Sequence, residues 1–343
     1  MKKKILVTGA SGFAAEHLIP KLRKAGHIVI GLDRKPNPSA ECDNFICTDL
    51  SLKGEVSDEI PSVDVLIHMA AARADWGVSD EEFVRDNVKA TKELLTGYLK
   101  TPPETLVFIS SISVMPQDTK LVIDEGVKPA PINIYGLSKK DAEDLCIEFQ
   151  KKTNTRLIII RPSVLYGPSD PCKTGIYRAA DNNIFRLIDG IYSNRFASVG
   201  SGDIIKSTAY VENFSDAIIF SLENSSQFEL YIYADSPALS LNEIIENICS
   251  SLRKKLPPKL PFYFVYVLSK VFDFLSFITR INFPINSSRV ETFIRPTNFK
   301  PKNFIDKGFE QKYSTEESLQ RTVSWYLDLR KRGSGFFIFK DKS

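Results

Sequence analysis

Short runs of aliphatic residues recur through the first half of the chain, with helical segments between most of them. Buried strands are predicted at residues 5–7, 28–30, 45–47, 65–67, 106–109 and 157–160. In the intervening segments, as at residues 18–22 and 83–99, apolar residues fall at i, i+3 and i+4, the period of a helix with one buried face. Continuous apolar strands joined by helices are typical of a parallel sheet covered on both faces. The pattern therefore predicts a doubly wound α/β sheet of about seven parallel strands.

The chain is long enough for a second, smaller lobe. Its 343 residues exceed the usual length of one simple domain, and 43% hydrophobic with 25% charged residues is the balance of a globular protein. We expect residues 1–167 to form the first domain, with residues 203–236 returning to it. Residues 168–202 and 237–330 would form a C-terminal α/β substrate-binding lobe, and residues 331–343 a tail. Helices are predicted at residues 211–222 and 240–252, the latter with a capping box from Ser240 to Glu243, and a strand at residues 230–233.

Charge and cysteine content exclude several classes of protein. A formal net charge of +3 without a strong basic cluster does not indicate nucleic-acid binding. Five cysteines without C-x-x-C spacing predict reduced thiols, a cytoplasmic protein and no metal site. No signal peptide is recognised, and no uninterrupted apolar run reaches the ~18 residues of a transmembrane helix.

The first predicted strand runs directly into Thr8-Gly9-Ala10-Ser11-Gly12-Phe13-Ala14-Ala15 and then a helix. Glycines at such a turn let the backbone approach a pyrophosphate, whose charge is stabilised at the helix N-terminus. This arrangement predicts a Rossmann-type dinucleotide site with Gly9, Ser11, Gly12 and Phe13 against the cofactor. Asp33 ends the second strand, where a carboxylate accepts hydrogen bonds from ribose hydroxyls and repels a 2′-phosphate. NAD is therefore preferred to NADP, although the neighbouring Arg34 could hold that phosphate.

Tyr135 and Lys139 stand four residues apart at the start of a predicted helix, so their side chains share one face. A phenol with a reference pKa of ~10 is a poor base near neutral pH, and an adjacent ammonium favours the phenolate. The pair is common on helix surfaces, and only its context makes it a candidate catalytic site. That context is the glycine loop upstream and a strand that ends at Ser110-Ser111.

Together these features resemble the extended short-chain dehydrogenase/reductase family, in particular its NAD-dependent epimerase/dehydratase branch. The resemblance extends to about residue 330. Its further motifs are Asp49-Leu50, His68-Met69-Ala70-Ala71, Asn87-Val88-Lys89-Ala90-Thr91, the segment from Arg161-Pro162 to Gly167-Pro168, and Ala209-Tyr210-Val211-Glu212-Asn213.

The resemblance implies roles for individual residues. Tyr135 would be the general base or acid, Lys139 would bind the nicotinamide ribose, and Ser111 would hydrogen-bond the reacting oxygen. Further cofactor contacts would come from Asp49, Leu50, Ala70, Ala71, Asn87 and Pro162, although Asn87 also suits a structural brace of the sheet. His68 is expected to be packed rather than catalytic. Arg178, Asn183 and Lys206 are the candidates for the substrate diphosphate.

Several reactions remain open on this scaffold. Dehydratases of the family carry an Asp-Glu pair where this chain has Ile112 and Ser113, so we set dehydration aside. The preferred prediction is a nucleotide-sugar 4-epimerase with retained NAD, acting on a UDP-hexose or UDP-N-acetylhexosamine through a 4-keto intermediate. The alternative is an NAD(P)H-dependent reductase of a 4-keto-6-deoxy nucleotide sugar. Val164, Met115 and Lys206 depart from the usual epimerase residues, which leaves the diphosphate contacts open.

Two further hypotheses are a 3β-hydroxysteroid-dehydrogenase-like enzyme and a non-catalytic NAD-binding protein. The first arises from the aromatic segment that begins at Phe262. We interpret its stripe of Phe262, Tyr266, Val267, Phe274 and Phe277 as buried helix core, with weak peripheral membrane contact as the alternative. By resemblance alone, a homodimer is expected through the helices around Val88 and Ala142.

Overall fold

The computed structural model describes residues 2–52, 60–73, 78–117, 121–169, 183–279 and 294–331, with residues 287 and 290. Its centre is one sheet of seven parallel strands in the order β11-β6-β5-β4-β1-β2-β3. The strands are β1 (Lys4–Thr8), β2 (Ile28–Asp33), β3 (Asn44–Cys47), β4 (Val65–His68), β5 (Thr105–Ile109), β6 (Arg156–Pro162) and β11 (Phe228–Tyr233). The predicted doubly wound fold and all of its predicted strands are confirmed.

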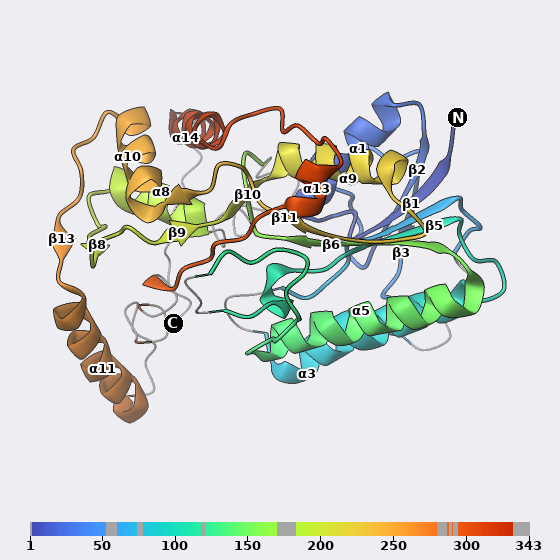
Figure 1. Cartoon of the computed structure of the whole chain (residues 1–343), viewed down its shortest axis with the longest axis horizontal. Helices are drawn as coiled ribbons and strands as arrows, with labels where there is room; N and C mark the ends of the chain where they lie inside the picture. Colours follow the sequence, from blue (N-terminus) through green and yellow to red (C-terminus); the bar gives the residue numbers. More distant parts are fainter. Residues whose placement is uncertain are drawn as a thin grey trace.

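Helices cover both faces of this sheet (Figure 1). On one face lie α1 (Phe13–Lys24), α9 (Val211–Asn224) and α13 (Lys302–Asp306). On the other lie α3 (Asp80–Phe83), a π-helical segment (Val84–Lys89), α4 (Ala90–Gly97) and α5 (Ile134–Thr153). Because side chains alternate along a strand, Ile5 and Val7 pack beneath α1 and α9, whereas Leu6 packs with α4 and α5. The continuous apolar strands of the sequence are thus explained by burial on both faces.

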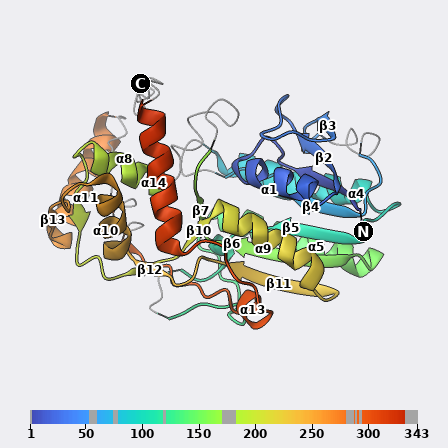
Figure 2. The same cartoon turned by 90° about the horizontal axis from the view of Figure 1, so that it is seen from above.

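A second hydrophobic core lies at one end of the sheet. It is built from α8 (Asn183–Tyr192), α10 (Leu241–Leu252) and α14 (Thr315–Lys331), which Figure 2 shows gathered beside the sheet. Two short strand pairs belong to this end, β8 (Ser198–Val199) with β13 (Lys259–Leu260) and β9 (Ile205–Lys206) with β12 (Leu239–Ser240). The predicted capping box is present, since Ser240 accepts a hydrogen bond from the Glu243 amide and Glu243 accepts one from the Ser240 amide.

The prediction of a buried aromatic stripe is wrong for part of α11 (Phe262–Thr279). Val267 is 49% exposed and Phe274 is 63% exposed, while Phe262 and Tyr266 are partly buried. The side chain of Phe277 lies outside the described residues. An apolar helix pattern shows that one face avoids water, but it does not say whether protein covers that face. No helix in the described part of the chain combines the length and apolarity needed to cross a membrane.

Candidate active site

Several predicted cofactor residues, and the predicted catalytic Ser111, follow the carboxyl ends of neighbouring strands. Gly9 comes after β1, Asp33 ends β2, Ala70 comes after β4 and Ser111 comes after β5. The chain passes outward from β1 to β2 and β3, and then returns to β4 on the other side of β1. In open parallel sheets, a crevice for ligands opens at such a switch in strand order. The fold therefore brings residues that are far apart in sequence to one edge of the sheet.

The glycine loop is shaped by close backbone approaches at this switch. Gly9 has φ +73°, and a Cβ at this position would lie 2.9 Å from the Ala70 amide nitrogen. A Cβ on Gly12 would lie 2.9 Å from the Gly9 carbonyl oxygen, to which the Gly12 amide donates a hydrogen bond. Ala15 is fully buried in the first turns of α1, so it packs in place of a third glycine. The loop thus places a glycine directly before the N-terminus of α1, as expected for a pyrophosphate site.

Asp33 and Arg34 have different partners at the end of β2. The Asp33 carboxylate accepts hydrogen bonds from the amides of Ser11 and Lys35, both at 3.0 Å. Arg34 Nη1 donates to the Asp86 carboxylate at 2.9 Å and lies 3.9 Å from that of Asp49. Asp33 therefore couples the glycine loop to β2, and Arg34 is held by acidic side chains that would compete with a 2′-phosphate for its charge.

The beginning of α5 is fixed against two neighbouring segments. Asn133 caps the helix, because its side-chain oxygen accepts a hydrogen bond from the Gly136 amide at 2.8 Å. A Cβ on Gly136 would lie only 2.2 Å from the Ser113 carbonyl oxygen, so only glycine lets α5 approach the 3-10 turn Ile112–Val114 this closely. Tyr135, one residue earlier, packs its ring against Phe83 with centroids 5.6 Å apart. The first turn of α5, which carries Tyr135, therefore lies against the 3-10 turn that follows β5.

Asn87 joins this helix to the edge of the sheet. It lies in the π-helical segment, a distortion often found at functional sites. Its side chain accepts a hydrogen bond from the Ala72 amide at 2.7 Å, and donates to the Ala72 carbonyl and to Ser138 Oγ. These contacts match a brace, and the predicted cofactor contact of Asn87 stays untested.

Lys139 is buried on the inner face of α5. Its ammonium lies 4.2 Å from the centre of the Phe108 ring, and burial lowers its pKa to about 8. His68 also packs on Phe108, and its ring bridges Thr8 Oγ1 at 2.7 Å and Thr91 Oγ1 at 2.9 Å. Burial, followed by the charge of Lys139, lowers the His68 pKa to about 3, so this imidazole is neutral. As expected, His68 is a packed core residue.

Two adjacent serines at the end of β5 differ in their contacts. Ser111 Oγ donates to Ser113 Oγ at 3.1 Å and accepts a hydrogen bond from the Ser113 amide. Ser110 Oγ is buried and has no hydrogen-bond partner among the described residues. Ser111 is thus held at the carboxyl edge of the sheet, where a substrate oxygen could reach it.

The remaining cofactor candidates lie along the same edge. Asp49 accepts hydrogen bonds from the amide and the hydroxyl of Ser51, and Leu50 is buried in the core beside α4 and α5. Ala71 is exposed after β4, and Pro162 is buried where β6 ends.

A cationic pair at β9 includes one residue that the sequence analysis missed. Lys206 in β9 donates from Nζ to the carbonyl oxygen of Arg295, and Arg295 Nη1 lies 3.5 Å from Gln117 Oε1. Burial and the nearby charge of Arg295 lower the Lys206 pKa to about 8. Asn183 is exposed at the first residue of α8, and Arg178 lies outside the described residues.

Two more contributions depend on contacts between residues that are distant in sequence. Gly136 could have been noticed because glycine is unfavourable inside a helix, but its contact with Ser113 is not local. Arg161 forms a two-pronged ion pair with Glu143, at 2.9 and 2.7 Å, and both side chains are almost fully buried. The pair ties β6 to α5 one turn beyond Lys139.

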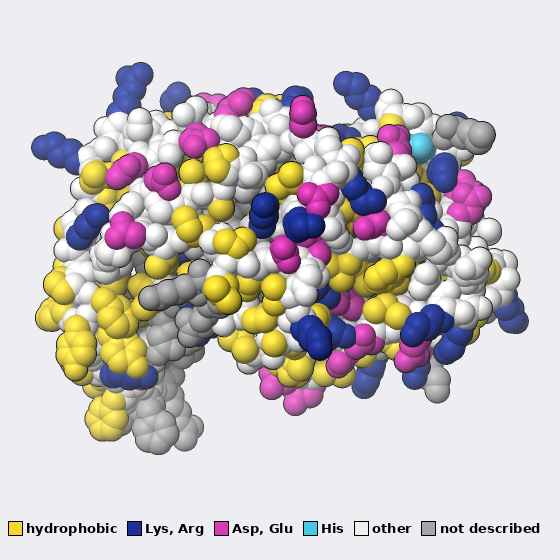
Figure 3. Space-filling model, viewed as in Figure 1, with side chains coloured by type: hydrophobic (Ala, Val, Ile, Leu, Met, Phe, Trp, Pro, Cys, Tyr) yellow, Lys and Arg dark blue, Asp and Glu magenta, His cyan; other side chains and the backbone are white. Residues whose placement is uncertain are grey.

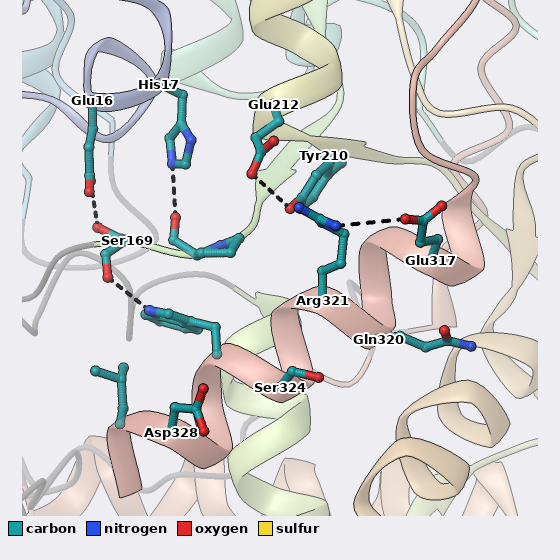
Figure 4. A pocket seen from close by; sticks show the side chains of 13 residues that line it. Glu16, His17, Ser169, Tyr210, Glu212, Glu317, Gln320, Arg321, Ser324 and Asp328 are labelled. Atoms are coloured by element: carbon teal, nitrogen blue, oxygen red, sulfur yellow. Dashed lines mark hydrogen bonds and ion pairs between the residues drawn. The ribbon is translucent and has the colours of Figure 1, made fainter. Parts of the chain in front are cut away.

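An open cavity of about 780 Å³ lies elsewhere, between α1 and α14 (Figure 4). Ser169 Oγ donates to Glu16 at 2.8 Å, and Trp325 Nε1 donates to the Ser169 carbonyl at 2.9 Å. These contacts join α14 to α1 through Ser169. None of the predicted site residues that the structure describes lines this cavity.

Comparison with known proteins gives a consistent result. Residues 5–232 match the model of the NAD dependent epimerase/dehydratase family. The N-acetyl-alpha-D-glucosaminyl-diphospho-ditrans,octacis-undecaprenol 4-epimerase of Escherichia coli O157:H7 is 30% identical over 98% of this chain and 99% of its own length.

Two solved structures share the fold. MoeE5 in complex with UDP-glucuronic acid and NAD is 23% identical with a TM-score of 0.73, covering 95% of this chain and 99% of that one. The UDP-N-acetylglucosamine 4-epimerase from Methanobrevibacter ruminantium M1, in complex with UDP-N-acetylmuramic acid, is 20% identical with a TM-score of 0.73, covering 96% and 100%. With a family match over most of the sheet and a relative aligned along nearly the whole chain, this protein belongs to the NAD-dependent epimerase/dehydratase family.

Proposed function

We propose that this protein is an NAD-dependent 4-epimerase of a sugar carried on a diphosphate. Two features support it most: the glycine loop and Ser111 follow the carboxyl ends of β1 and β5 in one sheet, and the first turn of α5, which carries Tyr135, contacts Ser113. Similarity over the whole chain to a 4-epimerase selects this reaction among those of the family. The nucleotide-sugar epimerase expected from the sequence is one form of this proposal.

The glycine loop fits NAD. Side chains at Gly9 and Gly12 would collide with the Ala70 amide and the Gly9 carbonyl, so only glycines allow the tight turn that a pyrophosphate-binding loop needs. Asp33 would accept from the adenosine ribose, and the engagement of Arg34 by Asp86 supports NAD over NADP. When bound, NAD would accept a hydride from the sugar carbinol carbon and return it to the opposite face.

The protein side chains would move the proton that accompanies this transfer. Tyr135 would take the proton of the sugar hydroxyl and later return it, and Ser111 would hydrogen-bond the same oxygen. Lys139 lies on the same helix face one turn away, so its positive charge would favour the Tyr135 phenolate. Burial of Lys139 excludes water and strengthens this electrostatic effect.

Lys206 and Arg295 would bind the diphosphate. Two cationic groups held together in a half-buried position repel each other, which is one reason why the Lys206 pKa is low. An anion between them would relieve this repulsion. Arg295 also supplies the planar guanidinium that Lys206 lacks for contacts with two phosphate oxygens.

The test is to measure NAD(H) and NADP(H) released from the purified, denatured protein, and then to assay 4-epimerisation. UDP-N-acetylglucosamine and N-acetylglucosamine-diphospho-polyprenol would be compared as substrates. Near-stoichiometric NAD and epimerisation of one of them are expected, and Tyr135→Phe should abolish turnover while NAD remains bound. An empty protein that reduces 4-keto sugars with NADPH would instead establish the reductase.

Assembly and compartment complete the proposal. Val84 in the π-helical segment and Leu137 in α5 are exposed apolar residues. Their exposure supports a homodimer in which these two helices contact a second copy of the chain. Leu137→Glu should then give a monomer in light scattering. The free thiols of Cys42, Cys47, Cys146 and Cys249 support a reducing, cytoplasmic compartment.

A further inference from the structure

The helix α11 presents a continuous apolar face to solvent. Seven exposed residues form it: Tyr263, Phe264, Val267, Leu268, Val271, Phe274 and Leu275. At ~100° per residue they fall within a sector of about 140° around the helix axis. Three are large aromatics, exposed by 77% at Tyr263, 62% at Phe264 and 63% at Phe274. We name these seven residues the α11 face.

The opposite side of the helix is turned toward the protein. Val265 and Ser269 are buried there. The two charged residues of the helix, Lys270 and Asp273, lie outside the apolar sector and both contact Ser287. Helix α11 projects from the small lobe, away from the sheet, and hydrophobic side chains gather on this end of the molecule (Figures 1 and 3). A patch of this kind on a soluble domain marks a surface for another partner.

The chemistry of the surrounding chain points to a lipid surface as that partner. From Arg253 to Phe272 the sequence has five basic residues and no acidic one. Arg253, Lys255 and Lys259 are exposed just before α11. Basic residues beside an aromatic, uncharged helix face are typical of helices that lie in the headgroup region of an anionic bilayer. The absence of a spanning helix among the described residues fits a helix that lies on the membrane.

The arrangement of the lobe connects this face to the candidate active site. Strand β13 leads directly into α11 and pairs with β8, and the Gly200 amide donates to the Leu260 carbonyl. From Gly200, just after β8, the chain continues into β9, which carries Lys206. The E. coli relative is named for a sugar diphosphate on undecaprenol, a lipid that resides in the bilayer.

We propose that the α11 face docks on the surface of an anionic phospholipid bilayer. There it holds the small lobe against the membrane that contains a polyprenyl-diphosphate sugar. The docking rests on the geometry of α11, whereas the identity of the lipid-borne substrate rests on the proposed function.

Flotation of the full-length protein with vesicles tests the docking without any turnover. Vesicles of phosphatidylethanolamine and phosphatidylglycerol should carry the wild type upward. The triple variant Tyr263→Ser/Phe264→Ser/Phe274→Ser should lower the bound fraction at least tenfold. A matched control, Leu99→Ser/Phe228→Ser/Ile305→Ser, removes exposed apolar residues elsewhere and should float like the wild type.

A second measurement covers the case in which the triple variant does not fold. The fluorescence of the tryptophan introduced by Phe264→Trp should shift to the blue when vesicles are present. The tryptophan introduced by Phe228→Trp should show no such shift. Failure of the wild type to float, or equal flotation of the triple variant, would overturn the proposal. A third outcome would also overturn it: a wild type that does not bind vesicles and forms an oligomer in light scattering, with a triple variant that is monomeric. In that case a second copy of the chain would cover the α11 face.

The two proposals fail separately. Vesicle binding without epimerisation of either substrate would leave the docking intact and refute the enzyme activity. Epimerisation of UDP-N-acetylglucosamine without vesicle binding would support the enzyme activity and refute the docking.

Discussion

The contact between Gly136 and Ser113 predicts a large effect of a single methyl group. In the variant Gly136→Ala, the new Cβ would lie 2.2 Å from the Ser113 carbonyl oxygen, whereas ordinary contacts begin at 3.4 Å. The first turn of α5 must therefore retreat by about 1.2 Å, the difference of these two distances. The Cβ is bonded directly to the α5 backbone and the Ser113 oxygen is itself a backbone atom, so no flexible side chain can absorb the shift.

Two effects on stability oppose each other, and their magnitudes decide the sign. Replacing glycine by alanine in a helix stabilises it by up to about 1 kcal/mol through propensity. Overpacking costs about 1–3 kcal/mol. We expect a net loss of stability. Since Tyr135 is the preceding residue, its hydroxyl would move with the turn, and a displacement of ~1 Å can lower the rate about 100-fold.

The assay is kcat for 4-epimerisation together with NAD content and urea unfolding. We expect kcat to fall about 100-fold while NAD stays bound, because the glycine loop belongs to β1 and α1 rather than to α5. The control is Gly126→Ala, where the nearest atom to the new Cβ is the flexible Asp124 carboxylate at 3.2 Å, and it should behave like the wild type. If Gly136→Ala keeps kcat within about threefold of the wild type, the argument that this glycine positions Tyr135 is wrong.

Three further predictions concern buried or paired charges. Arg161→Met should destabilise the fold by about 3–5 kcal/mol in urea unfolding, because it leaves the Glu143 carboxylate buried and unpaired. Adding Glu143→Gln should restore part of that loss; no recovery would contradict the explanation. Burial raises the pKa of Asp235 to about 7, above its unfolded value, so this group makes stability fall as pH rises from about 4 to 7. Asp235→Asn should remove roughly 3 kcal/mol of this decline between pH 5 and 8 in urea unfolding, and an unchanged pH dependence would refute it. Asp33→Asn keeps an oxygen for the Ser11 amide but removes the charge, so the preference for NAD over NADP should weaken by about tenfold in binding titrations. An unaltered preference would show that other groups set it.

The sequence by itself determined the local parts of this protein. The strands of the sheet were predictable because each is a run of apolar residues that must be buried on both faces. The glycine loop was predictable because a strand, a tight turn and a helix follow one another directly. Similarly, the Ser240–Glu243 capping box depends on residues three positions apart. The spacing of Tyr135 and Lys139 showed that they share a face, but only their context gave that face a function.

The tertiary structure decided what depends on residues that are distant in sequence. Gly136 contacts Ser113 and Arg295 lies beside Lys206 because separate elements pack together, and no local period encodes either meeting. For α11, the apolar pattern predicted a face that avoids water but could not say what covers it, since protein and lipid select the same residue types. Only the fold showed that this helix extends away from the core, with its aromatic face uncovered.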